Sequence, residues 1–173
     1  DKSHLERVLP HLDEKGTFTR IYDKRNEREV LTEGARGNVF QAFDDHPPIY
    51  DNWELSVYHK EIMWEIDNVE SIEVVEKTAV SASLKIVRKF LSSTITQVIT
   101  IYKDIPRIDF DTQADWHEHH IFVKVAFPVD ILSDKATYEI QYGAVERPTH
   151  FNTSWDSAKF EVCAHKWADL SET

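Results

Sequence analysis

The 173-residue sequence has little cysteine and little glycine. Its single cysteine, Cys163, cannot form an internal disulfide, which agrees with the reducing compartment of the cytoplasm. Four glycines are few for a chain rich in turns, so Asn, Asp and Pro are expected to form the bends. No stretch approaches the roughly 20 apolar residues of a membrane-spanning helix, and the opening DKSHLERVLP has no apolar signal core. The sequence therefore predicts a cytoplasmic protein without a membrane partner.

Positive charge is also in short supply. The chain carries 31 acidic residues against 20 Lys and Arg, a formal net charge of -11. A surface of this sign repels phosphate backbones, so nucleic acid is excluded as a partner. The hydrophobic share of 41% and the charged share of 29% are typical of a folded protein. Because no linker interrupts the sequence, one domain with a sizeable core is expected.

Several signatures of catalytic sites are absent. The sequence holds no Gly-rich phosphate loop, no cysteine pair and no serine nucleophile elbow. Cys163 lies in FEVCAHKW, a predicted strand, where a buried and inert thiol is expected. We therefore assign no catalytic residue to the chain.

Alternation of apolar and polar residues is the main pattern of the sequence. Strands are expected at residues 17–22, 39–43, 72–77, 81–90, 93–102, 107–116, 121–127, 137–142 and 160–165. The fourth and fifth of these are separated by a short turn and predict a β-hairpin. No helical stripe longer than two turns occurs. The pattern favours an all-β, antiparallel fold, most simply a large β-sandwich.

The stretch DWHEHHIFVKV raises the question of a metal site. On a strand, residues two apart share a face, so His117 and His119 would point one way and Glu118 and His120 the other. Two imidazoles do not complete a zinc site, which needs three or four ligands. Histidines at a strand end, facing water or bonding across strands, are the simpler interpretation. No metal ligand is assigned.

The stretch VERPTHFNTSWD gathers groups that hold sugars, between two predicted strands. Arg147 can bind hydroxyls or a carboxylate, Asn152 both donates and accepts, and Trp155 offers a flat apolar surface. His150 and Asp156 complete the set. In the structural alternative, Arg147 pairs with Asp156 and Trp155 closes the end of the sandwich. The residues alone leave both interpretations open.

A third cluster lies in FDDHPPIYDNWELSVYHK and contains Asp44, Asp45, His46, Asp51 and Trp53. Paired acids beside aromatic rings suggest glycoside chemistry, in which one carboxyl attacks and another donates a proton. A retaining mechanism needs the two carboxyls about 5 Å apart, which a sequence does not show. Acids in a proline-rich loop are more often turn formers and solvated charges, the interpretation that we favour.

Three long stretches resemble a known family: GNVFQAFDDHPPIYDNWEL, DWHEHHIFVKVAFPVDI and ATYEIQYGAVERPTHFNTSWDSAKFEVCAHKWADLSE. They are similar to the β-sandwich region of family 38 glycoside hydrolases, the α-mannosidases, and most of all to the cytosolic type. The resemblance covers residues 17–173 and implies a galactose mutarotase-like β-sandwich. Residues 1–16 are then a linker or leading segment, and the chain is expected to be a middle fragment of a multidomain enzyme.

The resemblance also implies a function. Family members hydrolyse terminal, non-reducing α-D-mannose residues with retention. Their nucleophile and a zinc-type divalent ion belong to a barrel domain and a helical bundle that this sequence does not contain. The chain is therefore expected to be non-catalytic, to have no cofactor of its own and to pack on those two domains.

The same resemblance leads to a hypothesis for substrate-binding residues at the rim of the sugar pocket: Arg147, His150, Asn152, Trp155 and Asp156. Arg147 and Asn152 would bind hydroxyls, His150 would donate a hydrogen bond, and Trp155 would stack on the sugar or anchor the loop. The alternatives are a stand-alone carbohydrate-binding module and an interdomain scaffold. An incomplete sandwich with open sheet edges also leaves room for a homo-oligomer formed by strand pairing.

Overall fold

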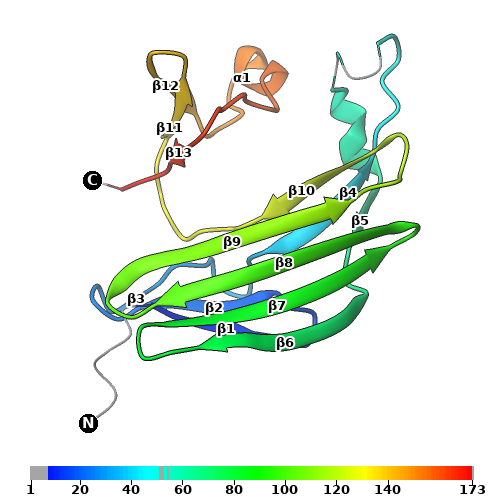
Figure 1. Cartoon of the computed structure of the whole chain (residues 1–173). Coiled ribbons are helices and arrows are strands. Elements are labelled where there is room, and N and C mark those ends of the chain that lie inside the picture. The colour runs from blue at the N-terminus through cyan, green and yellow to red at the C-terminus, as the bar shows by residue number, and fades with distance from the viewer. Residues whose placement is uncertain (1–7, 51–52, 54, 173) are drawn as a thin grey trace. The chain divides into compact units, whose positions relative to one another are not determined.

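The computed structural model describes residues 8–50, 53 and 55–172. The chain divides into two compact units, Asp1–Val129 and Asp130–Thr173 (Figure 1). The composition of the sequence predicts a single domain instead. Within the described residues, no helix is long and apolar enough to cross a membrane.

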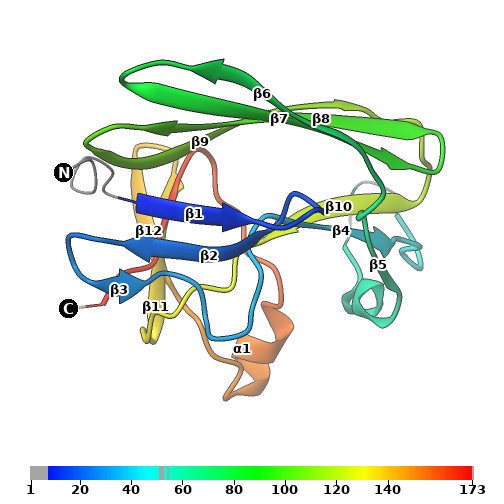
Figure 2. The ribbon, with the colours of Figure 1, turned by 90° about the horizontal axis from the view of Figure 1, so that it is seen from below.

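The first unit is a β-sandwich. One layer is a four-stranded sheet of β6 (Val69–Lys77), β7 (Ser81–Phe90), β8 (Ser93–Tyr102) and β9 (Ile105–Asp115), in that order. The facing layer holds the sheet β1 (Val8–Leu12), β2 (Phe18–Asp23), β3 (Arg28–Glu29) and the sheet β10 (Ile121–Ala126), β4 (Val39–Asp44), β5 (Met63–Glu65) (Figure 2). A short 3-10 helix, η1 (Val57–Glu61), precedes β5. All these pairs are antiparallel, which confirms the predicted fold class.

The hairpin of β7 and β8 forms as predicted. Its pairing runs from Ser81 opposite Tyr102 to Phe90 opposite Ser93. Leu91 in the turn has φ 49°, the left-handed backbone that a tight hairpin connection requires. This register turns Ile86 and its alternate neighbours toward the facing layer, because side chains of a strand alternate between its two faces.

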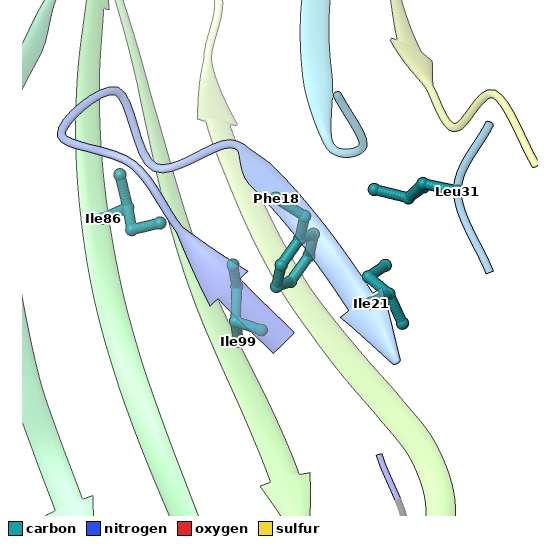
Figure 3. Close-up of a cluster of buried hydrophobic side chains, with 5 residues drawn as sticks. All are labelled: Phe18, Ile21, Leu31, Ile86 and Ile99. Atoms are coloured by element: carbon teal, nitrogen blue, oxygen red, sulfur yellow. The ribbon is translucent and has the colours of Figure 1, made fainter. Parts of the chain in front are cut away.

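Two apolar clusters between the layers hold the sandwich together. In the first, residues of β2, β7 and β8 meet one residue that follows β3: Phe18, Ile21, Ile86, Ile99 and Leu31 (Figure 3). In the second, residues of β4 and β8 meet one residue that follows β5: Phe40, Ala42, Ile95 and Ile66. Each large side chain buried in this way contributes about 2 kcal/mol. Because β8 contributes to both clusters, it ties the two sheets of the facing layer to the four-stranded sheet.

A polar seam also crosses the sandwich interior. The side-chain amides of Asn38 and Gln97, both buried, bond to each other at 2.7 and 3.2 Å. Arg88, only 1% exposed, donates to the carbonyl of Gly16 at 2.8 Å, and burial lowers the pKa of Arg88 to about 10. Gly16 has φ 68°, and a Cβ there would lie 2.7 Å from Arg88 Nη2. The seam therefore requires glycine at position 16.

Part of the 1–16 stretch, expected to be a linker or leading segment, lies within the sandwich. Residues 8–12 of the 1–16 stretch form β1, which pairs along β2. Val8 and Leu12 pack against the first apolar cluster. This burial explains why the segment is part of the sandwich.

The second unit is a small sheet with one short helix. It contains β11 (Lys135–Ile140), β12 (Gly143–Pro148) and β13 (Ala168–Asp169) in the order β12-β11-β13, and α1 (Ser154–Ala158). Among its described residues Ala136 alone is buried. A unit with so little apolar burial gains little stability from its own core.

The predicted strand at residues 160–165 is wrong. These residues have no strand structure, although Phe160, Val162 and Ala164 alternate with polar residues. Both edges of β11 are already paired, one with β12 and the other with β13. Cys163 is accordingly exposed, not buried in a strand as its sequence context predicts.

Candidate functional site

The 147–156 segment belongs to the predicted loop of residues 146–156 and contains three kinds of structure. Arg147 lies on β12 opposite Ala136, the next residues form a loop, and Trp155 and Asp156 lie in α1. The strand predicted at residues 137–142 ends at Ile140, and a hairpin turn follows. Tyr142 has φ 60°, so the chain reverses at this residue and continues as β12.

Asp156 caps the helix α1. The Thr153 hydroxyl donates to Asp156 Oδ2 at 2.7 Å, and the backbone N–H of Asp156 donates to Thr153 Oγ1 at 3.2 Å. The Thr153 backbone N–H donates back to Asp156 Oδ2 at 3.2 Å, completing a capping box. The hydroxyl bond, and to a lesser degree the charge of His150, hold the pKa of Asp156 below its usual value. The main task of this carboxylate is thus to order the helix start.

The other four predicted site residues differ in how free their side chains are to bind a ligand. His150 Nδ1 lies 3.5 Å from Asp156 Oδ2 and accepts from the Asn152 backbone N–H at 3.4 Å. Arg147 Nε is buried without a hydrogen-bond partner among the residues that the structure describes. Trp155 is 78% exposed, so it does not anchor the loop within the second unit. The segment thus presents an open indole beside an ordered His–Asp pair.

A second cluster forms in the first unit, where β4 ends and β10 begins. Ile121 pairs with Asp44, so the antiparallel register brings the two histidine-rich and acid-rich stretches of the sequence together. The His46 and His120 rings stack with centroids 4.7 Å apart, and His46 Nδ1 lies 3.1 Å from Asp44 Oδ2. The Asp45 backbone N–H donates to the His120 carbonyl at 2.8 Å. Distant parts of the sequence therefore build one surface.

The HEHH stretch is a turn between β9 and β10, not a strand. His117 Nε2 lies 3.0 Å from Asp115 Oδ1. Glu118 Oε1 accepts three hydrogen bonds of 2.7 to 2.9 Å, two from Ser92 in the β7–β8 turn and one from Ser93, the first residue of β8. These bonds, the Ser93 hydroxyl bond above all, hold the pKa of Glu118 below its usual value. Within the described residues no group of three His, Cys, Asp or Glu is placed to hold a metal ion.

Two hollows flank the end of β4, and both are lined in part by Asp45. The larger, of about 370 Å³, is here named the β4–β10 hollow and is lined by Asp45, Trp116, Glu118, His119, His120, Ile121 and Phe122. The smaller measures about 120 Å³ and reaches η1. Asp45 Oδ1 is buried and has no hydrogen-bond partner in the described part of the chain. Asp51, predicted as part of this cluster, lies outside the described residues.

His59 supports this end of the sandwich and was not singled out from the sequence. It is 3% exposed, with Nδ1 2.6 Å from the Ser56 carbonyl and Nε2 3.3 Å from Lys124 Nζ. Its ring meets Phe43 and Phe122 edge on. A lone histidine within a 3-10 helix gives no sequence signal of such burial, because its ring packs against residues of β4 and β10.

The chain is similar in sequence to a known protein family and to several known proteins. A family model described as the glycosyl hydrolases family 38 C-terminal domain matches residues 9–173. Alpha-mannosidase 2C1 of Homo sapiens is 40% identical over 163 residues, 93% of this chain and 16% of that protein. Alpha-mannosidase G of Dictyostelium discoideum is 35% identical over 163 residues, 91% of this chain and 15% of that protein.

A solved structure shares the fold. The crystal structure of an alpha-mannosidase from Enterococcus faecalis V583 matches with a TM-score of 0.64 at 16% identity, covering 86% of this chain and 20% of that one. At this identity the likeness concerns the fold alone. The chain thus spans about one sixth of the length of the curated relatives it matches.

Proposed function

The chain belongs to the family of glycosyl hydrolases family 38 C-terminal domains, and we propose that it is a non-catalytic segment of an α-mannosidase. The parent enzyme hydrolyses terminal, non-reducing α-D-mannose residues with retention of configuration. The observation that carries this proposal is the match over residues 9–173, together with curated relatives that bear the name alpha-mannosidase. The cytoplasm, the compartment proposed for the parent, agrees with the single, unpaired Cys163.

In the parent enzyme the 147–156 segment lines the rim of the sugar pocket. The exposed indole of Trp155 is available to stack on a sugar ring, and Arg147 carries a buried Nε without a partner among the described residues. His150 and Asn152 add polar groups beside them, while Asp156 orders the segment through its capping box. Stacking and hydroxyl binding together are the usual means of holding a saccharide.

The same unit also packs on the barrel and helical domains of the parent. Its described residues include only one buried apolar side chain, Ala136, whereas Leu132, Phe151 and Trp155 are largely exposed. Exposed apolar surface of this kind marks interaction sites in soluble proteins. The open edges β6 and β9 of the four-stranded sheet leave room for pairing between two copies.

A divalent metal of the zinc type is proposed for the parent, as the resemblance implies. Zinc needs three or four ligands, and the described residues of this chain offer no such group. The residues present here therefore do not fit the ion, and no step of the reaction is assigned to it in this segment.

The full-length protein tests the proposed function. We expect it to release mannose from an aryl α-mannoside and expect ¹H NMR to detect the α anomer first, because a retaining mechanism preserves configuration. Initial release of the β anomer would contradict retention. A folded full-length protein that releases no mannose from any α-mannoside would contradict the assignment itself.

A further inference from the structure

Large apolar side chains are exposed on η1 and on the residues beside it, and together they are here named the η1 face: Tyr50, Trp53, Val57, Tyr58, Ile62 and Met63. The helix and the loop after β4 stand together where β4 ends (Figure 1). We propose that the η1 face docks on a part of the parent enzyme outside these 173 residues. This rests on the proposed function, and it gives the first unit a docking face of its own.

The η1 helix is an ordered element, held on its own sheet by His59. The His59 ring is 3% exposed, its Nδ1 atom lies 2.6 Å from the Ser56 carbonyl, and it meets Phe43 and Phe122 edge on. The backbone N–H of Tyr58 donates to Ser56 Oγ at 3.3 Å, which caps the helix. Because three residues complete a 3-10 turn, burial of His59 leaves Tyr58 facing away from the sheet. A surface ordered in advance loses little conformational entropy when it docks.

The exposed area is that of a protein interface. Tyr50, Trp53 and Tyr58 are 57, 84 and 68% exposed, and at about 200 Å² for a whole aromatic side chain they offer roughly 400 Å². This area equals the largest apolar patch of a typical monomer, and it is about half of the roughly 800 Å² that each partner buries in a standard interface. The aliphatic side chains of the face add to it. Aromatic rings are also enriched at the centres of interfaces.

The parent chain is the occupant that the length comparison favours. The curated relatives have more than four fifths of their length outside the region that this chain covers. A polypeptide of that size is large enough to supply a complementary surface. Because it is joined covalently to this segment, its effective concentration at the η1 face is high.

The charge around the η1 face opposes pairing with a second copy. Between residues 44 and 65 the sequence has six acids and one lysine. Arg36 pairs with one of these acids, Glu65, through two contacts of 2.8 Å, and the stretch stays acidic. Two copies meeting face to face would bring like charges together, which disfavours association. The complementary surface on the parent is therefore apolar at its centre and rimmed by Lys and Arg.

The direct test is hydroxyl-radical labelling of the full-length protein, read by mass spectrometry. The labelling rates of Trp53 and Tyr58 in the folded protein are compared with their rates after unfolding in urea. Docking predicts rates severalfold lower in the folded protein than exposures of 84 and 68% allow. Rates in proportion to those exposures would overturn the inference.

Two variants of the full-length protein sharpen the test. Tyr58→Glu places a further acid in the apolar centre of the contact, so we expect the labelling of Trp53 and Ile62 to rise severalfold. The matched control Leu91→Glu changes a side chain that is 73% exposed in the β7–β8 turn, and is expected to leave both rates unchanged. Equal rates in Tyr58→Glu and the wild type would contradict the docking. If Tyr58→Glu does not fold, the wild-type rates decide the question.

Two further measurements separate the alternatives. Protection of the η1 face that disappears on dilution, as the mass falls from two chains to one, would assign the face to a second copy and overturn the inference. If the full-length protein releases mannose while the η1 face is labelled freely, this inference fails and the proposed function stands. A protected face in a full-length protein that releases no mannose gives the reverse result.

Discussion

Asp13 holds the turn between β1 and β2 through its carboxylate. Its Oδ1 accepts the backbone N–H of Thr17 at 2.9 Å and that of Lys15 at 3.0 Å, and its Oδ2 accepts the Thr17 hydroxyl at 2.7 Å. Burial raises the pKa of Asp13, but these hydrogen bonds, together with the charge of Arg36, bring it below its usual value. The ionised form therefore stabilises the turn that carries Gly16.

The depressed pKa predicts an acid-sensitive contribution to stability. The stabilisation by ionised Asp13 is fully present above the pKa of this residue in the unfolded chain, which is about 4. It is lost as the pH falls through the lower pKa that Asp13 has in the folded protein. Asp13→Asn is expected to lower the free energy of unfolding by about 1 kcal/mol near neutral pH and by progressively less in acid. Urea unfolding over a pH series measures this, with Asp111→Asn as an exposed control. A difference that stays constant with pH would show that the charge is irrelevant.

Single residues were the hardest feature to predict from the sequence. The alternation marks Leu84, Ile86 and Phe90 as one face of a strand, and Arg88 lies on that same face. Its partner atoms are backbone carbonyls more than 70 residues away, at Lys15 and Gly16. No local pattern contains that information, because the contact exists only once the two layers meet.

At the scale of elements, strands with long alternation were predicted well. The predictions for β7, β8 and β9 match because each has about ten residues of regular alternation and a neighbour close in sequence. Short strands were harder to predict from the sequence. β1 has five residues including Pro10, and β12 follows a two-residue turn that contains Tyr142, a residue favoured in strands.

The 147–156 segment yields a prediction at this scale. In the full-length protein, Arg147→Ala and Trp155→Ala are each expected to lower kcat/KM for a mannoside about tenfold, through lost hydroxyl binding and lost stacking. Tyr142→Ala is the matched control, since this fully exposed aromatic lies at the hairpin turn of the same unit. If all three variants fold and equal the wild type in kcat/KM, the segment is structural.

For the molecule as a whole, the candidate sites depend on tertiary pairing to different degrees. The residues of the 147–156 segment are neighbours in sequence, so their type and spacing were enough to select them. The β4–β10 hollow unites residues from separate stretches through the pairing of Ile121 with Asp44. The sequence marks Asp45 and His120 by residue type, but their proximity arises only from the pairing of β4 with β10.

The central claim is that this chain is a non-catalytic part of an α-mannosidase. The most direct measurement is release of aryl alcohol from an aryl α-mannoside, with added divalent metal, by the 173-residue chain and by the full-length protein side by side. We predict release by the full-length protein alone. Metal-dependent turnover by the chain itself would contradict the account, because the catalytic groups would then lie within these 173 residues.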